Sequence, residues 1–559
     1  MAHLQALPTE LLDRIFSLVA KIGGSLDGGT FAGKDDLARL CLVCRQFRHV
    51  AQPLLFRYFD GEDLEANITA LMCFTRAICR RPQLGEYVRF LSVDDRSDTG
   101  RTQLPEIGPD ERAALEDTIR TLRLHDPDVD GERREVYPPE EDWFAWLEQG
   151  DLAIVLPMLL LKTPKLRKLR LPHETFLQGN ISILLGGANN FLSDLDEIWV
   201  TCDDRSEVGY DIGSYCTAVN RDKMKGPTFE YGDLRGNQWP VAWAPGTLAV
   251  DELSFTQCYI DAEGVRKLVG ACKKLKSFIY QNFTLNEEES RHGWESPTGR
   301  EPEFNPIDLH AVLTPHKETL EHIHLDYDRQ PWIHETPEAY QEYCDRQAKM
   351  PSLRDFAALE SLIIQHSLLP EHPQFPTSIQ KLRINDCDSS IRDMVANIAT
   401  DAKNGHYPHL TEIKVLTVDV TKPIKLRGQR IPPGMTPKDG FFSLRALFEG
   451  TKVDFQILPH EADVYAPLPP YGNPHRGRED DNESDEYDDD FDGLYGYDGY
   501  LDIDDPYGYD IPLSDLLGPF GPALRRAMQG PMLEDIEDDE DDDDRSWVTE
   551  DEGDEFGVD

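Results

Sequence analysis

Several features that would place this chain at a membrane or outside the cell are missing from its 559 residues. The longest apolar run, residues 152–161, is about half of the ~20 residues that a membrane span requires. The N-terminus lacks the basic stretch and apolar core of a secretory signal. Ten cysteines are scattered without a dense framework, which favours reduced thiols. These absences predict a protein of the cytoplasm, the nucleus or both, with no membrane partner.

Sequence patterns of common catalytic sites are also absent. The chain has no glycine-rich phosphate loop with its Lys-Ser/Thr, no Gly-x-Ser-x-Gly and no His-Glu-x-x-His. Cys41 and Cys44 form a CxxC, but no second CxxC or histidine pair follows at zinc-ligand spacing. We therefore expect a non-catalytic protein that uses no metal or cofactor, in which these two thiols pack between helices.

Positive charge is scarce, and the shortage is uneven along the chain. The formal net charge is −47, and residues 459–559 hold 34 acidic against 5 basic residues, which leaves the rest near −18. A chain with this much negative charge repels nucleic acid unless it carries a local basic patch. Nucleic acid is therefore not an expected partner. Runs such as "EDIEDDEDDDD" repel themselves, and we expect this tail to be disordered.

Apolar side chains are abundant near the N-terminus. In "LQALPTELLDRIFSLVA", residues 4–20, they follow Pro8 at helical spacing, and proline suits a first helical position. A second amphipathic helix is predicted for "DDLARLCLVCRQFRHVAQPLLF", residues 35–56. Two such short helices cannot bury all of their own apolar surface. Some of it must therefore meet another surface.

These two segments, in this order, resemble an F-box. The resemblance covers residues 4–59, although "KIGGSLDGGTFAGK" between the helices is longer than the family's usual short turn. F-box helices dock on a Skp-family adaptor that links them to a cullin ubiquitin ligase, so the resemblance implies both as partners. Packing of the helices on the chain's own next domain is the alternative. The adaptor-binding residues that the resemblance implies are Leu7, Pro8, Leu11, Leu12, Ile15, Phe16, Leu40, Val43 and Cys44.

A second pattern, apolar-x-x-apolar-x-apolar, recurs nine times between residues 88 and 415. Each match reads as a short strand, and several follow a helical stretch. The pattern resembles a degenerate leucine-rich repeat, in which stacked strand-helix units share a core and the strands line a concave face. The steps between matches range from 20 to 78 residues, so the repeat must be irregular. An ordinary α/β domain with similar buried strands is the alternative.

The expected fold class is therefore α/β, in three parts. An N-terminal all-helical F-box precedes an irregular leucine-rich-repeat-like α/β solenoid, and a disordered acidic C-terminal tail follows it. The expected boundaries are 4–59 for the F-box, 60–165 for a helical connector with the first repeat-like strand, 166–458 for the repeat domain and 459–559 for the tail.

Strand alternation predicts which side chains line the concave face, because successive Cβ atoms point to opposite faces of a sheet. Apolar anchors and an arginine that could clamp a carboxylate or phosphate are typical of protein-binding surfaces. For any single residue, a solvated sheet face is the simpler interpretation. The candidate target-binding residues are Lys168, Arg170, Trp199, Ile279, His322, His324, Ile363, Lys381 and Arg383.

Together these patterns predict the substrate-recognition subunit of a Skp-cullin-F-box ubiquitin ligase. The F-box would bind the adaptor, and the repeat domain would hold an unknown target protein close to the ubiquitin-charged enzyme. The acidic tail could fold back on the basic strand ends at Lys168/Arg170 and Lys381/Arg383. Two alternatives are an acidic-tailed binding protein or chaperone for basic proteins such as histones, and a non-degradative F-box scaffold.

Overall fold

The computed structural model describes the following residues: 7–22, 33–61, 67–93, 107–123, 147, 152–172, 192–202, 210–234, 236, 243–281, 305–326, 347–387, 391–417 and 443–459. The predicted acidic tail lies outside these residues, except for Pro459. No helix in the described ranges is long and apolar enough to cross a membrane.

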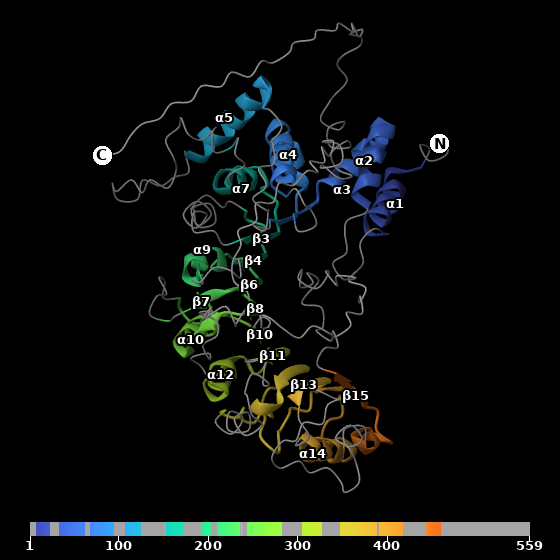
Figure 1. The fold of residues 1–559 in the computed structure, drawn as a ribbon, viewed down its shortest axis with the longest axis vertical. Coiled ribbons are helices and arrows are strands. Elements are labelled where there is room, and N and C mark those ends of the chain that lie inside the picture. The colour runs from blue at the N-terminus through green and yellow to red at the C-terminus, as the bar shows by residue number, and fades with distance from the viewer. Residues whose placement is uncertain are drawn as a thin grey trace, which may run out of the picture.

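Three helices open the chain (Figure 1): α1 (Thr9–Ile22), α2 (Gly33–Val43) and α3 (Arg45–Leu55). The sequence predicted one continuous helix over residues 35–56, and the structure divides it at Cys44, whose φ of −162° and ψ of 168° are extended. The Cys44 Sγ accepts a hydrogen bond from the Phe47 amide at 3.4 Å and so caps α3. The break lets α2 and α3 pack on each other.

Aromatic packing joins these helices to one another and to the next part of the chain. The Phe16 ring of α1 meets the Phe47 ring of α3 edge to face, with centroids 5.3 Å apart. Phe74 of α4 (Asn67–Arg80) packs against Phe56 at 5.5 Å and Phe59 at 4.8 Å. Because such contacts bury large rings, the three N-terminal helices are continuous with the core that follows them.

Twelve parallel strands form one curved sheet, and their spatial order is their order along the chain. This arrangement, in which neighbours in space are neighbours in sequence, is that of a solenoid. The strands are β1 (Tyr58–Asp60), β2 (Phe90–Ser92), β3 (Lys168–Pro172), β4 (Glu197–Thr201), β6 (Gly226–Glu230), β8 (Glu252–Thr256), β10 (Ser277–Gln281), β11 (His322–Asp326), β12 (Ser361–Gln365), β13 (Lys381–Cys387), β14 (Glu412–Thr417) and β15 (Asp454–Pro459). A small parallel sheet is formed by β5 (Tyr210–Asp211), β7 (Gly232–Leu234) and β9 (Tyr259–Ile260).

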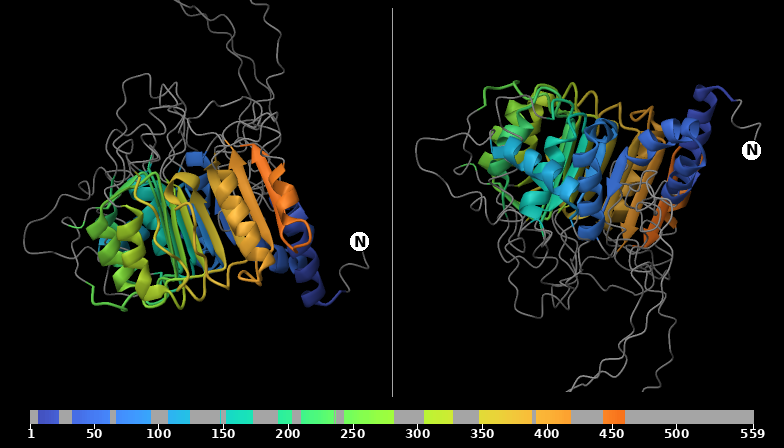
Figure 2. Two further views of the ribbon diagram at one scale, coloured as in Figure 1. Left: turned by 90° about the horizontal axis from the view of Figure 1, so that it is seen from below. Right: turned by 90° about the horizontal axis from the view of Figure 1, so that it is seen from above.

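Helices follow the outer side of the curved sheet (Figure 1), and the strands stand side by side in Figure 2. They are α5 (Pro109–Arg123), α7 (Leu152–Leu161), α9 (Cys216–Val219), α10 (Ala262–Ala271), α12 (Pro306–Leu313) and α14 (Ile391–Lys403), with α4. Short 3-10 helices are η2 (Pro82–Tyr87), η3 (Ile212–Tyr215), η5 (Thr314–His316), η7 (His366–Leu368) and η8 (Leu444–Phe448). The longest apolar run of the sequence is the buried helix α7, which explains why it is apolar all round.

All nine predicted strands form, and each apolar position of their pattern is at most 1% exposed. The predicted α/β class is confirmed. Three further strands of the twelve-stranded sheet escaped the pattern, because each breaks it at one position. Gly61 stands at the third position for β1, Pro227 at the second for β6 and Lys452 at the first for β15.

Candidate protein-binding surfaces

The N-terminal helices expose several large apolar side chains. Leu11, Ile15 and Leu18 are spaced four and three residues apart on α1, so they share one side of that helix. Burying one such half-exposed side chain against a partner gains about 1–2 kcal/mol. Among the described residues, five of the seven exposed large apolar side chains lie on α1 and α2, and we call these five the α1–α2 apolar face: Leu11 (48%), Ile15 (38%), Leu18 (54%), Leu42 (41%) and Val43 (44%).

The nine residues that the sequence predicted as adaptor-binding all lie in this three-helix unit, in three different settings. Leu12 and Phe16 are buried in the chain's own core. Partly buried against that core are Leu7, Leu40 and Cys44. The exposed members are Pro8, Leu11, Ile15 and Val43.

Two side chains of the α1–α2 apolar face, Leu18 and Leu42, were not among the sequence-based candidates. The helical spacing that places Leu11 and Ile15 on one side of α1 also places Leu18 there, so that signal was present. Leu42 is adjacent to Val43 at the end of α2, and only the position of α3 shows which side of α2 is covered. The adaptor role of all these residues stays a prediction.

The CxxC cysteines have structural positions within the helices. Cys41 is buried, and burial raises the pKa of its thiol to about 11, which keeps it protonated at neutral pH. Cys44 caps α3 through its Sγ, which accepts the hydrogen bond from the Phe47 amide. In the part of the chain that the structure describes, no group of three or more histidine, cysteine, aspartate or glutamate side chains gathers as metal ligands.

The second candidate surface is the sheet face opposite to the core-facing side chains. Backbone pairing aligns one residue of each strand in a central row across the sheet, and the residues two positions earlier in an earlier row. All nine predicted target-binding residues belong to these two rows. The central row is Arg170, Trp199, Thr228, Ser254, Ile279, His324, Ile363, Arg383, Lys414 and Gln456. The earlier row contains Lys168, Glu197, Glu252, Ser277, His322, Ser361, Lys381, Glu412 and Asp454.

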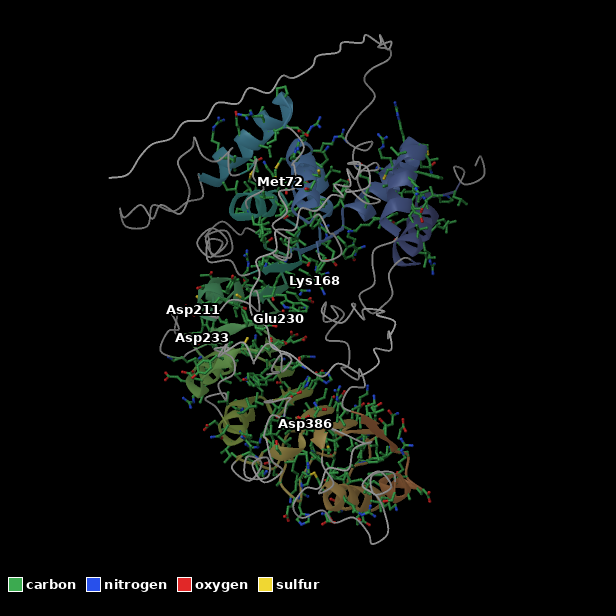
Figure 3. The ribbon with its side chains drawn as sticks, viewed as in Figure 1. Met72, Lys168, Asp211, Glu230, Asp233 and Asp386 are labelled. Atoms are coloured by element: carbon green, nitrogen blue, oxygen red, sulfur yellow. The ribbon has the colours of Figure 1, made fainter. Side chains whose placement is uncertain are left out.

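At the β3–β4 end of this face, an arginine stacks on a tryptophan. The Arg170 guanidinium carbon lies 4.1 Å from the centroid of the Trp199 ring. Burial lowers the pKa of Arg170, while the carboxylates of Glu230 and Asp60 oppose that shift. Lys168, labelled with Glu230 in Figure 3, pairs through Nζ with the Glu197 Oε2 at 2.7 Å. The half-buried Trp199 ring is therefore the accessible part of this stack, and the buried Arg170 guanidinium supports it.

Further along the sheet, from β10 to β13, buried polar side chains form hydrogen bonds near the carboxyl ends of the strands. Arg383 Nε donates to Asn385 Oδ1 at 3.0 Å, and Asn385 Nδ2 donates to Asp326 Oδ2 at 3.4 Å. The ring Nε2 of His324 lies 3.3 Å from Gln281 Nε2. His324 and Arg383 are only 9% and 6% exposed, so their side chains are held within the protein.

The predicted target-binding residues therefore differ in access. Arg170, Ile279, His324 and Arg383 are buried. The side chains that a partner could reach directly are those of Lys168, Trp199, His322, Ile363 and Lys381, which are exposed or half-buried. Their binding role is untested and stays a prediction.

The comparisons with known proteins bear on the first surface. Residues 4–61 match the family model of the F-box-like domain, close to the predicted range of 4–59. No curated protein matches the chain. The leucine-rich-repeat assignment of the curved sheet stays a prediction. The chain thus carries an F-box-like domain at residues 4–61, which comprises α1 to α3 and the first strand of the sheet.

Proposed function

We propose that this F-box protein is the non-catalytic, substrate-recognition subunit of a Skp-cullin-F-box ubiquitin ligase. The observation that carries the proposal is the α1–α2 apolar face, which lies within the matched F-box-like domain. Exposed leucine, isoleucine and valine side chains on two packed helices favour docking into an apolar groove. The groove is that of a Skp-family adaptor, which binds a cullin in turn.

The connection between the two candidate surfaces supports the second half of the proposal. Phe56 and Phe59 pack on Phe74, and Glu111 of α5 binds Arg76 and, at 3.4 Å, Arg80 of α4. The F-box-like domain is thus packed onto one end of the curved sheet (Figure 1). A target held on the concave face would keep a defined position relative to the adaptor, which raises its effective concentration near the ubiquitin-charged enzyme.

The adaptor half is tested by co-purification of the full chain with a purified Skp-family adaptor. Ile15→Asp places a charge in the docking face, and we expect it to remove the adaptor. The matched control is Ile307→Asp, which makes the same replacement at a 54% exposed position of α12. Equal adaptor recovery by the two variants would refute docking through the α1–α2 apolar face.

The target half is tested by identifying the proteins that bind the chain and following their ubiquitylation. A true target should lose binding to the Trp199→Ala variant and keep its binding to the Ile15→Asp variant, because the two substitutions lie on different surfaces. Its ubiquitylation should require the intact α1–α2 apolar face. Bound proteins that never become ubiquitylated would favour the non-degradative scaffold.

A second candidate function, binding of basic proteins such as histones, is favoured by one observation. Residues 459–559 contain 34 acidic and 5 basic residues. Neutralising these acidic residues distinguishes the two functions. A basic-protein chaperone loses its clients while adaptor binding persists, whereas the receptor keeps both the adaptor and its targets.

A further inference from the structure

A row of residues immediately before the strands runs along one edge of the curved sheet. In this pre-strand row, each backbone N–H donates to the carbonyl of the preceding member, as in Arg89 N to Arg57 O at 2.9 Å and Arg167 N to Arg89 O at 2.9 Å. These bonds fix the members at strand spacing, about 4.8 Å apart. From β1 to β11 the row reads Arg57, Arg89, Arg167, Asp196, Lys225, Asp251, Lys276 and Glu321.

Charges alternate in sign along most of this row. Arg167 Nε binds Asp196 Oδ2 at 3.0 Å, and Lys276 Nζ binds Glu321 Oε1 at 2.9 Å. Opposite charges on adjacent strands stabilise a sheet, and like charges oppose it. The alternation fails only at the F-box end of these eight positions, where Arg57, Arg89 and Arg167 follow one another. We call these three residues the arginine row.

The arginine row carries a local excess of positive charge. Burial lowers the pKa of Arg89, and so do the neighbouring Arg57 and Arg167, while Asp194 and Glu86 oppose the shift. Those two carboxylates already bind lysines: Asp194 binds Lys223 at 2.5 Å, and Glu86 binds Lys165 at 3.2 Å.

Within the described residues, neither Arg57 nor Arg89 forms an ion pair. Arg89 Nη1 donates to the backbone carbonyls of Glu86 at 2.6 Å and Val88 at 2.9 Å. The exposed Arg57 lies with its guanidinium carbon 5.4 Å from the Tyr58 ring centroid. This is an unusual concentration of positive charge on a chain whose net charge is −47.

We propose that the arginine row binds the acidic segment 534–544 of the same chain. That segment, "EDIEDDEDDDD", has 10 carboxylates in 11 residues, and guanidinium–carboxylate hydrogen bonds are strong and directional. The contact differs from the one suggested by sequence, because Arg170 and Arg383 are buried while Arg57 and Arg167 are exposed.

The length of the chain allows this contact. The edge from β15 to β1 crosses eleven strand spacings, about 53 Å along the sheet. The 74 residues between Pro459 and Glu534 reach up to ~250 Å when extended. Attachment to the same chain also gives the segment an effective concentration on the order of millimolar, which an acidic segment of another protein must overcome.

The test uses the full chain and a labelled synthetic peptide of the sequence of residues 534–544 as the probe. Its affinity is measured by fluorescence anisotropy at about 20 mM salt, where exposed charges are weakly screened. In a second full-length chain, each aspartate of the segment is replaced by asparagine and each glutamate by glutamine. We expect this neutralised chain to bind the peptide at least ten-fold more tightly, because the arginine row is vacated.

Variants of the neutralised chain show which residues cause the increase in peptide affinity. Arg57→Ala with Arg89→Ala should abolish it, and Arg57→Ala alone should reduce it several-fold. Lys225→Ala is the matched control, since it removes an exposed cation of the same row that stands between Asp196 and Asp251. Equal peptide affinity of the two full chains, or a gain that survives loss of both arginines, would overturn the proposal. Thermal unfolding verifies each variant's fold, and the assay involves neither adaptor nor target.

Discussion

The α1–α2 apolar face and the concave face of the sheet differ in how their side chains are held. The first exposes aliphatic side chains, such as Leu11 and Leu18, that none of the described residues covers. On the second, charged and polar side chains already bind each other, as in the Lys168–Glu197 pair and the Arg383–Asn385 bond. Burying an apolar face in any complementary groove is favourable. A polar face whose side chains are already paired binds favourably only to a partner that replaces the hydrogen bonds and ion pairs lost on binding. The comparison favours a constant adaptor on the first face and a selective target on the second.

The largest expected effect is a difference in stability between substitutions on the buried and the exposed side of α1. Leu12→Ala empties a fully buried position and should lower the free energy of unfolding by about 3 kcal/mol, because a cavity remains in the core. Leu11→Ala, one residue earlier and 48% exposed, should change it by no more than about 0.5 kcal/mol. Chemical denaturation of the full chain measures both. Similar values for the two variants would contradict the assignment of inner and outer sides.

A smaller effect is expected where the α1–α2 apolar face extends onto α2. Leu42→Asp should weaken adaptor binding about thirty-fold, or ~2 kcal/mol, because a charge is then desolvated in the interface. Surface plasmon resonance with an immobilised adaptor gives the affinity. If Leu42→Asp binds as tightly as Ile307→Asp, the docking surface is confined to α1.

On the concave face, single substitutions should have milder effects. Trp199→Ala removes the half-buried ring beneath Arg170 and should weaken target binding about ten-fold, or ~1.4 kcal/mol. Adaptor affinity should stay unchanged. Quantitative recovery of bound targets, normalised to recovered adaptor, measures the ratio. A parallel loss of adaptor would show that the two surfaces are not independent.

The smallest effect concerns the surface ion pair on the same face. Glu197→Gln removes the partner of Lys168 and should cost no more than about 0.5 kcal/mol of stability, because both side chains contact solvent. The cost should shrink further in high salt. Denaturation at low and high salt is the measurement. A salt-independent loss of several kcal/mol would show that the pair is desolvated.

Much of the fold could be predicted from sequence because its core repeats a local pattern. The triad Leu169, Leu171 and Leu166 illustrates it: all three are buried, and the intervening Lys168 and Arg170 lie on the other face. The strands at residues 58, 226 and 454 were missed because a solenoid tolerates a glycine, proline or lysine at one position when its neighbours supply the pairing partners.

The candidate surfaces were harder to predict, because exposure depends on contacts that are distant in sequence. Helical spacing alone could not separate Leu11 from Leu12, since the position of α3 decides which one is covered. Likewise, alternation placed His324 and Arg383 on the concave face, but the structure buries both side chains and pairs them by hydrogen bonds with Gln281 and Asn385. The arginine row became visible only when the topology placed residues 57, 89 and 167 side by side.

Calorimetric titration of a Skp-family adaptor into the full chain at several temperatures tests the central claim most directly. We expect one adaptor per chain and a clearly negative heat capacity change, because the α1–α2 apolar face becomes buried on binding. Ile15→Asp should abolish the signal, and Ile307→Asp should preserve it. The absence of binding, or binding that Ile15→Asp leaves intact with no heat capacity change, would contradict the account.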